Sequence, residues 1–321
     1  MVSIVVPTHQ RHQPLSRLLT ALAGQASGTE PFEVIVIVDG STDGTCELLD
    51  MLQLPYPLTW HRQDQKGRAA ACNAGLARAR GAIVVFLDDD MEPTERFVTA
   101  HASSHPDGSR RAVIGAAPIA IRAGDPTVVR YVGNKFNRHL ERLNAPGHRF
   151  ALRDVYSGNL SIRREILSEV GGFDEAFRVY GHEDLELAWR LRASGVEFRF
   201  NPDACASQHY EKDFSALAHD NVGKGRTAVM LAGKHPAVAP ELKLATAGQG
   251  SAPRRLLLRA LIAATGVWPS LFGAVAYLAE RLGDRRPANV ERIYGIALDY
   301  CFLLGARAAR RETAGASAVH R

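Results

Sequence analysis

Short apolar runs alternate with amphipathic stretches along the first hundred residues of the chain. The runs are rich in valine and isoleucine, whereas the stretches between them repeat apolar residues every three or four positions. The runs predict β-strands at 3–6, 33–38, 58–61 and 82–87, and the stretches predict helices at 14–23, 45–52, 68–79 and 94–103. Such alternation, with nearly continuous apolar strands, is typical of an α/β fold with a mostly parallel sheet and helices on both faces.

The pattern changes beyond residue 110. Strands are predicted at 112–121, 157–162, 196–200 and 204–209, helices at 127–143, 183–194 and 215–233, and a polar loop at 144–154. Residues 236–253 are rich in alanine, glycine and proline, which is typical of a linker. We therefore expect one α/β domain over 1–235, divided into halves 1–110 and 111–235, followed by a C-terminal helical region over 254–321.

The C-terminal region contains an apolar stretch, 260–279, without a charged residue. It is about as long as the shortest membrane span, but Gly266 and Pro269 interrupt it. Three alternatives stay open: a membrane span, an amphipathic element at the membrane surface, and helices packed on the core. The preceding arginines, Arg254, Arg255 and Arg259, suit anionic lipid headgroups or a solvated basic face.

Composition narrows the class of protein. The 321 residues are 46% apolar and 23% charged, which describes a globular chain rather than a disordered one. The net charge of +5 suits an anionic ligand or surface, but the basic residues are scattered, so we expect no nucleic acid partner. Four separated cysteines indicate free thiols, and no basic leader precedes the first strand, so a cytoplasmic location is expected.

Three consecutive acids, Asp88, Asp89 and Asp90, follow the strand predicted at 82–87. Like charges this close repel one another and raise their pKa values, and a divalent cation such as Mg²⁺ or Mn²⁺ commonly relieves the repulsion. If the segment stays extended, Asp88 and Asp90 share one face. The alternatives are a loop of solvated acids and the capping of the next helix.

Other polar residues follow the neighbouring strands. Pro7 and Thr8 end the first strand and Asp39 ends the second, so both should reach the crevice at the carboxyl edge of the sheet. Asp39 suits an imide N–H of a nucleobase or an Asx turn. Arg68 begins a helix, where phosphate is favoured. Neither dinucleotide-binding nor Walker-type glycine motifs occur.

Two further positions combine residue types that catalysis uses. Glu183 and Asp184 open the helix at 183–194, where acids act as helix caps or as a rigidly held general base. His209 ends the strand at 204–209 and is either a packed imidazole or a metal ligand.

Taken in order, these motifs resemble those of the family 2 glycosyltransferases, which have the GT-A fold. The resemblance covers Val2 to about His235. It is carried by Ile4-Val5-Val6-Pro7-Thr8, Val38 to Thr45, Gly67 with Asn73-Ala74-Gly75, Phe86 to Asp90 with Pro93, Gly158-Asn159, Gly171 to Asp174, Gly181 to Asp184 with Trp189-Arg190-Leu191, and Asn201 to Ala204 before His209.

The resemblance implies roles for single residues. It assigns nucleotide-sugar binding to the half 1–110, through Pro7, Thr8, Asp39, Arg68, Asp88 and Asp89, and acceptor binding and catalysis to the half 111–235. It assigns the ligation of Mn²⁺ or Mg²⁺ to Asp90, Asp88 and His209. Asp184 matches the catalytic base, with Glu183 as its neighbour. Two departures, His9-Gln10 for a frequent aromatic–Asn pair and Val38 for a frequent aspartate, leave the nucleobase open.

The implied activity is metal-assisted, inverting transfer of a sugar from a UDP-, GDP- or dTDP-sugar to an acceptor hydroxyl. A lipid-linked acceptor and a glycan are both open, as is attachment to the inner face of the cell membrane through 254–321. A sugar-nucleotide pyrophosphorylase is the rival enzyme class, but Pro7-Thr8-His9-Gln10 is not its glycine-rich loop. An inactive scaffold is the non-enzymatic rival, and the presence of both Asp90 and Asp184 argues against it.

Overall fold

The computed structural model describes residues 1–25, 30–245 and 249–319, which form two compact units. Unit 1 consists of Met1–Ala120, Lys135–Arg178 and Glu183–Tyr210. Unit 2 consists of Ile121–Asn134, Val179–His182 and Glu211–Arg321, as far as these residues are described. The chain passes between the units several times, so neither unit is a continuous segment.

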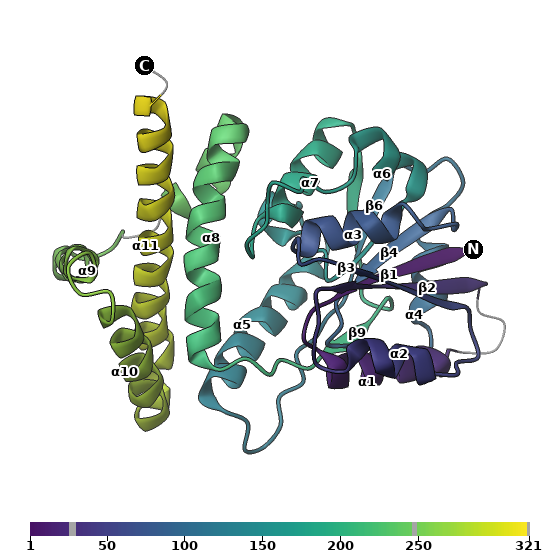
Figure 1. Cartoon of the computed structure of the whole chain (residues 1–321), viewed down its shortest axis with the longest axis horizontal. Coiled ribbons are helices and arrows are strands. Elements are labelled where there is room, and N and C mark those ends of the chain that lie inside the picture. Colours follow the sequence, from purple (N-terminus) through teal and green to yellow (C-terminus); the bar gives the residue numbers. More distant parts are fainter. Residues whose placement is uncertain (26–29, 246–248, 320–321) are drawn as a thin grey trace. The chain divides into compact units, whose positions relative to one another are not determined.

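Unit 1 is built on a seven-stranded sheet with the order β3-β2-β1-β4-β7-β6-β8 (Figure 1). The strands are β1 (Val2–Thr8), β2 (Phe32–Asp39), β3 (Leu58–Gln63), β4 (Ile83–Leu87), β6 (Arg111–Gly115), β7 (Asn159–Arg163) and β8 (Glu197–Asn201). Strands β1 to β4 are parallel, and β7 runs antiparallel to both β4 and β6. The prediction of a mostly parallel sheet is confirmed.

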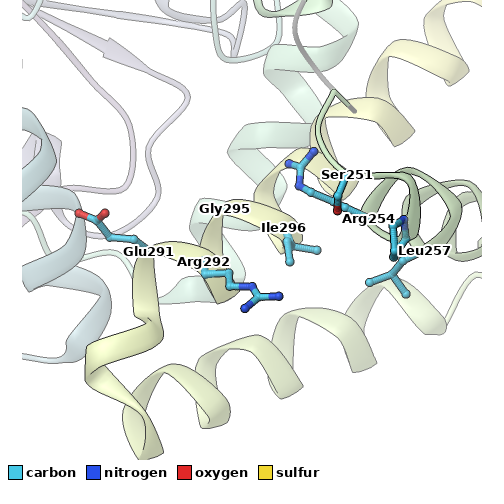
Figure 2. Close-up of a pocket in the computed structure, with 8 residues that line it drawn as sticks. Ser251, Arg254, Leu257, Glu291, Arg292, Gly295 and Ile296 are labelled. Atoms are coloured by element: carbon cyan, nitrogen blue, oxygen red, sulfur yellow. The ribbon is translucent and has the colours of Figure 1, made fainter.

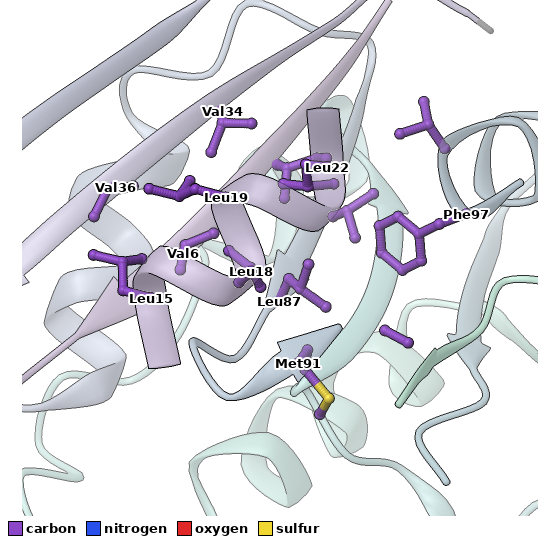
Figure 3. Close-up of a cluster of buried hydrophobic side chains, with 14 of the residues drawn as sticks. Val6, Leu15, Leu18, Leu19, Leu22, Val34, Val36, Leu87, Met91 and Phe97 are labelled. Atoms are coloured by element: carbon purple, nitrogen blue, oxygen red, sulfur yellow. The ribbon is translucent and has the colours of Figure 1, made fainter. Parts of the chain in front are cut away.

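Helices cover both faces of this sheet because successive side chains of a strand point to opposite sides. The helices of unit 1 are α1 (His12–Ala23), α2 (Thr45–Met51), α3 (Arg68–Leu76), α4 (Phe97–Ser103), α6 (Arg164–Val170) and α7 (Glu183–Ala193), and α5 (Thr127–Leu143) is shared by both units. Leucines of α1 pack on Val6, Val34 and Val36 (Figure 3). On the other face, Gly75 of α3 lies against Val5, and a Cβ there would overlap its side chain.

Two predicted strands differ from the structure. The strand expected at 112–121 ends at Gly115, although Ala117 and Ile119 are buried, because Ile119 forms only an isolated bridge to Gln208. The apolar residues after Gly115 are therefore buried side chains, but their backbone does not continue the pairing of the strand. The strand expected at 204–209 is β9 (Ala206–Gln208), which pairs with β5 (Met91–Pro93) in a separate two-stranded sheet.

Unit 2 is helical, with α8 (Phe214–Lys234), α9 (Ala252–Thr265), α10 (Leu271–Arg285) and α11 (Val290–Val319). Helices α8 and α11 run side by side, and α9 lies on the side of α11 away from α8 (Figure 1). Two glycines permit the close approach, because Gly225 of α8 lies against Phe302 and Gly305 of α11 lies against Val222. Tyr294, Tyr300 and Phe302 fill the core of this unit.

The predicted boundary at residue 235 differs from this division, because α8 packs within unit 2. The predicted linker at 236–253 contains short 3₁₀ helices at Pro236–Glu241 and Lys243–Ala245, with Val238 and Leu242 buried, while 246–248 lie outside the described residues. The apolar stretch 260–279 is divided between α9 and α10 by a turn at 266–270. Among the described residues, no helix has the length and apolar character needed to cross a membrane.

Candidate active site

The three strand-end acids lie in a turn between β4 and β5 rather than in an extended segment. The backbone N–H of Met91 donates to the carbonyl of Asp88 at 3.3 Å and closes this turn. The extended conformation that would place Asp88 and Asp90 on one face is therefore not formed. Asp89 and Asp90 instead share Arg11 as their ion-pair partner, whereas Asp88 pairs with Arg68.

Arg68, the first residue of α3, is the partner of Asp88. Its Nη2 lies 2.6 Å from Oδ1 of Asp88, and its Nη1 donates to the hydroxyl of Ser157 at 2.8 Å. Burial alone lowers the pKa of Arg68, but Asp88, then Cys72 and Glu183, raise it well above its ordinary value. Gly158 lets Asp88 approach β7, because a Cβ at this position would overlap the carboxylate. The structure thus gives a reason for Gly158 in the motif.

Arg11 is the partner of the other two acids. Its Nη2 lies 2.7 Å from Oδ2 of Asp90 and its Nε 3.3 Å from Oδ1 of Asp89. The hydroxyl of Thr8, at the end of β1, donates to Oδ2 of Asp89 at 2.7 Å, and Pro7 is buried beside it in the same strand. Burial raises the pKa of Asp89 to about 7, although Arg11 and Thr8 lower it, and Asp90 and Asp88 raise it further.

The loops after β1 and β2 hold Arg11 in place. Gln10 has a φ of 53°, a left-handed conformation that residues other than glycine and asparagine rarely adopt. Its backbone N–H donates to Ser41 at 2.9 Å, and its side chain exchanges hydrogen bonds with Thr42. His9 contacts the carbonyl of Asp39 at 2.6 Å.

Asp39 organises the loop that leads into α3. Its Oδ1 accepts hydrogen bonds from Gln63 and from the N–H of Lys66, each at 2.8 Å, and its Oδ2 accepts one from the N–H of Gly67 at 2.9 Å. A carboxylate has about four lone-pair positions, so about one remains for a ligand. The structure therefore gives Asp39 a positioning role in addition to the predicted contact with a nucleobase.

The helix-start acids lie in unit 1 with the strand-end acids. Glu183 is buried, and its electrostatic interaction with Arg68 brings it within reach of the group that holds Asp88. Asp184 is half-buried, and its Oδ1 accepts a hydrogen bond from the N–H of Leu185 at 2.8 Å. The charges of Asp88 and Glu183 thus act on the same guanidinium, although about a hundred residues separate the two acids in the chain.

His209 does not join the acids as predicted. Its Nε2 lies 2.6 Å from Oε2 of Glu92, while its backbone N–H donates to the carbonyl of Asp90 at 2.9 Å. The pairing of β5 with β9 causes this arrangement, because it sets the backbone of His209 beside Asp90 and its ring beside Glu92. Gln208 reaches Asp90 instead, at 3.3 Å.

Two observations test whether a divalent cation fits this site. Within the described ranges, no group of three or more His, Cys, Asp or Glu side chains is arranged to hold a metal ion. The carboxylate oxygens of Asp88 and Asp90 are nevertheless the hard ligands that Mg²⁺ and Mn²⁺ prefer, and Arg11 already holds a positive charge against Asp90. The oxygen ligands suit such a cation chemically, but Arg68 holds Asp88 and Arg11 holds Asp90, so both guanidinium groups must move before the two carboxylates can bind it.

Sequence reasoning missed Arg11 and Ser157, because their partners lie 78 to 89 positions away in the chain. It also missed a buried network behind β7. There, His101 contacts Ser161 and Asn159, each at 2.8 Å, and His105 contacts Ser161 at 2.8 Å. Burial lowers the pKa of His101 to about 4 and that of His105 to about 3. The network supports the sheet beneath the site.

Comparison with known protein families gives the class of this protein. The model of glycosyl transferase family 2 matches residues 3–171, which is more than half of the chain, and a model described as the N-terminal domain of galactosyltransferase matches residues 138–213. The chain therefore belongs to glycosyl transferase family 2.

Individual relatives agree with this assignment. The chain is 25% identical to the uncharacterized glycosyltransferase YfnE of Bacillus subtilis, with 68% of this chain and 67% of that protein covered. It is 28% identical to the pre-mycofactocin glycosyltransferase of Mycobacterium tuberculosis, covering 73% of this chain and 48% of that one. For the validoxylamine A glucosyltransferase of Streptomyces hygroscopicus the identity is 26%, and the coverage is 78% and 60%. The chain thus spans about half to two thirds of these relatives.

Solved structures share the fold. The mannosyltransferase PcManGT of Pyrobaculum calidifontis, in complex with GDP-Man and Mn²⁺, has a TM-score of 0.57 at 20% identity, covering 96% of this chain and 86% of that one. TarS 1–349 of S. aureus, in complex with UDP-GlcNAc, has a TM-score of 0.54 at 14% identity, covering 97% and 92%. At these identities the likeness establishes the GT-A fold.

Proposed function

We propose that this chain is an inverting glycosyltransferase that moves a sugar from a nucleotide diphosphate to an acceptor hydroxyl. One observation carries the proposal: Arg68 pairs with Asp88 at 2.6 Å, and the charge of Glu183 at the start of α7 acts on the same guanidinium. Sugar transfer needs one charged group at the leaving diphosphate and a carboxylate at the acceptor hydroxyl. Membership of family 2 supports the same reaction class.

The donor would bind along the carboxyl edge of β1, β2 and β4. Arg68 and the N–H groups at the start of α3 favour the diphosphate, because a helix N-terminus attracts anions. Thr8, Pro7 and the remaining lone pair of Asp39 would contact the nucleoside, and Asp88 and Asp89 the ribose or sugar. UDP-, GDP- and dTDP-sugars are the candidate donors, and two structural neighbours hold GDP-Man and UDP-GlcNAc.

Asp90 and Asp88 would hold Mn²⁺ or Mg²⁺, with His209 joining them only if its ring leaves Glu92. When bound, the cation would act as a Lewis acid that stabilises the leaving diphosphate. Neighbours solved with Mn²⁺ support this cofactor. Arg11 must release Asp90 before a cation can take that carboxylate.

Asp184 would accept the proton of the acceptor hydroxyl, with Glu183 as its neighbour in the same helix turn. We assign no second carboxylate as a nucleophile, so the transfer is a single displacement and inverts the anomeric carbon. Free cysteines, which are Cys46, Cys72, Cys205 and Cys301, fit a reducing compartment, so we place the enzyme in the cytoplasm.

The proposal is tested with Asp184→Asn. This variant should bind the donor about as well as the unmodified enzyme, because Asp184 acts on the acceptor, while turnover falls by about 10²- to 10⁴-fold. Calorimetry with a nucleoside diphosphate and an assay of donor hydrolysis in Mn²⁺ measure the two quantities. Asp203→Asn, which changes an exposed acid in the same unit, is the matched control and should leave both unchanged.

Two results would contradict the proposal. Turnover of Asp184→Asn within a few-fold of the unmodified enzyme would reject Asp184 as the base. Tight binding of nucleoside diphosphates by the unmodified enzyme, without hydrolysis or transfer from any candidate donor, would identify an inactive scaffold instead.

A further inference from the structure

Large apolar side chains are exposed on α9, on α10 and on the turn between them. Their exposed fractions lie between 46% and 70%, and the residues are Leu256, Leu257, Val267, Trp268, Tyr277 and Leu278. Single exposed apolar residues are ordinary, but a set this dense within two successive helices and the turn between them marks an interaction surface. Helix α9 lies on the side of α11 away from α8, so this surface does not belong to the α8–α11 contact (Figure 1).

The exposed residues of α9 form a stripe. Leu256, Ala260 and Ala263 recur at intervals of four and three residues, which places them on one face of α9, and Val267 follows in the turn after the helix. All four residues are exposed. Leu258, by contrast, is buried against the rest of unit 2. The helix therefore has one apolar residue set that packs inside the unit and a second that faces outward.

The charged residues next to the α9 stripe are arginines. Residues 251–279 contain three arginines and no acidic residue, and the acids of α10, Glu280 and Asp284, follow after this segment. Arg254 is held by an ion pair with Asp299, but Arg255 and Arg259 are exposed and flank the stripe one position away. A stripe of apolar residues bordered by arginines complements a surface that is apolar beneath and anionic above.

A pocket of about 420 Å³ adjoins the surface and lies within unit 2 (Figure 2). Leu257 of α9 and Ile296 of α11 supply apolar parts of its wall, Arg254 and Arg292 supply cationic parts, and Glu291 supplies an anionic part. The two cations outnumber the one anion, which favours an anionic group such as a phosphate beside the apolar wall. The pocket and the stripe thus favour the same kind of partner.

We propose that the α9–α10 surface, defined as Leu256, Leu257, Ala260, Ala263, Val267, Trp268, Tyr277 and Leu278 with Arg255 and Arg259, docks on an anionic lipid bilayer. Helices α9 and α10 have 14 and 15 residues, fewer than the roughly 20 that a span needs, so they lie in the interface. Trp268 occupies the turn between them, and tryptophan is enriched where the headgroups meet the acyl chains.

Sedimentation of the full chain with vesicles tests this inference. Vesicles of phosphatidylcholine with about one third phosphatidylglycerol should carry the protein down, and vesicles of phosphatidylcholine alone should do so at least tenfold less well. Brominated lipids should quench the fluorescence of the tryptophans, and Trp268→Phe should remove most of the quenching because Trp60 and Trp189 lie in unit 1.

Two variants separate the apolar and charged contributions. Trp268→Ser should weaken the partition coefficient about tenfold or more, because a tryptophan side chain buries a large apolar area. The double variant Arg255→Gln with Arg259→Gln should weaken it about 25-fold on anionic vesicles, at about five-fold for each arginine. Arg62→Gln with Arg96→Gln, two exposed arginines of unit 1, is the charge-matched control and should bind as before.

Three outcomes would overturn the inference. The first is no sedimentation with either vesicle. The second is equal binding to neutral and anionic vesicles that the double arginine variant does not change. The third is a dimer in light scattering that Trp268→Ser converts to a monomer without vesicle binding, since the partner would then be a second copy of the chain. None of these outcomes bears on sugar transfer, which is assigned to residues of unit 1.

Discussion

Replacing Arg11 by glutamine tests how the strand-end acids are neutralised. In the structure, Arg11 holds Asp90 at 2.7 Å and Asp89 at 3.3 Å. A divalent cation that binds Asp90 must displace this guanidinium, so the ion pair opposes the cation. We therefore expect Arg11→Gln to bind Mn²⁺ more tightly than the unmodified protein when no nucleotide is present.

The size of the effect follows from the contact. A hydrogen bond to a charged group is worth about 1.5–3 kcal/mol, and the lower part of this range applies because the side chain of Arg11 is 26% exposed. Removing that competition should tighten Mn²⁺ binding by about 10- to 30-fold. The same change leaves Asp89 and Asp90 without their cation, so the metal-free variant should unfold at a lower temperature.

Two measurements check the expectation. Electron paramagnetic resonance of free Mn²⁺ gives the dissociation constant without nucleotide, and thermal unfolding with and without MnCl₂ gives the stability. The variant should be less stable than the unmodified protein in the absence of metal and should gain more from added Mn²⁺, because tighter binding stabilises the folded state more.

Two controls decide the interpretation. Arg11→Lys keeps a positive charge and should stay closer to the unmodified protein than Arg11→Gln does. Asp90→Ala should lose the Mn²⁺ dependence of nucleotide binding. If Arg11→Gln binds Mn²⁺ equally or more weakly, Arg11 does not compete for Asp90 and the reasoning fails. If Asp90→Ala keeps its metal dependence, Asp90 is not a ligand.

Two further predictions concern residues behind the site. Asp39→Asn should lower the free energy of unfolding by about 1–3 kcal/mol and weaken donor binding, because an amide cannot accept both loop N–H groups as the carboxylate does. Urea denaturation measures the change, and an unchanged midpoint would contradict the prediction. Burial lowers the pKa of His101 from 6.5 to about 4 in the folded protein. Between these two pH values a proton binds the unfolded chain but not the folded protein, so the free energy of unfolding falls as the pH falls. The unmodified protein should therefore lose about 1.4 kcal/mol more of its free energy of unfolding than His101→Asn does between about pH 7.5 and about pH 5.5. An equal loss in the two proteins would refute this prediction.

The sequence best predicted the bounds of those helices and strands that depend on residues within the segment itself. The helix expected at 127–143 has the bounds Thr127–Leu143, because its amphipathic pattern is complete within the segment. The parallel strands were found within two residues of their ends. The strand at 112–121 was too long, since Ala117 and Ile119 are buried without continuing the ladder, and burial alone does not reveal a hydrogen-bond partner.

The candidate site was predictable in its residues but only partly in their partners. The acids at 88–90 and 183–184 were identified, and the expected parallel sheet explained why strand-end residues meet. Their counter-ions were not predicted, because Arg11 reaches Asp90 across 79 positions. The ring of His209 was assigned to the acids, although Glu92 competes for it at 2.6 Å. A sequence motif indicates which residue types can bind a metal, but it does not show whether another side chain, such as Glu92, already occupies one of them.

The pairing of the acids changes what their clustering implies. Repulsion among Asp88, Asp89 and Asp90 suggested a cation as the means of relief, but Arg68 and Arg11 supply two positive charges from distant elements. The folded chain can therefore tolerate the cluster before any cation arrives. A donor diphosphate would attract the same two arginines, and their movement toward it would leave carboxylates able to bind a cation. We therefore expect a donor and a divalent cation to bind cooperatively, because the diphosphate would neutralise the arginines and the cation would neutralise the carboxylates of the same ion pairs.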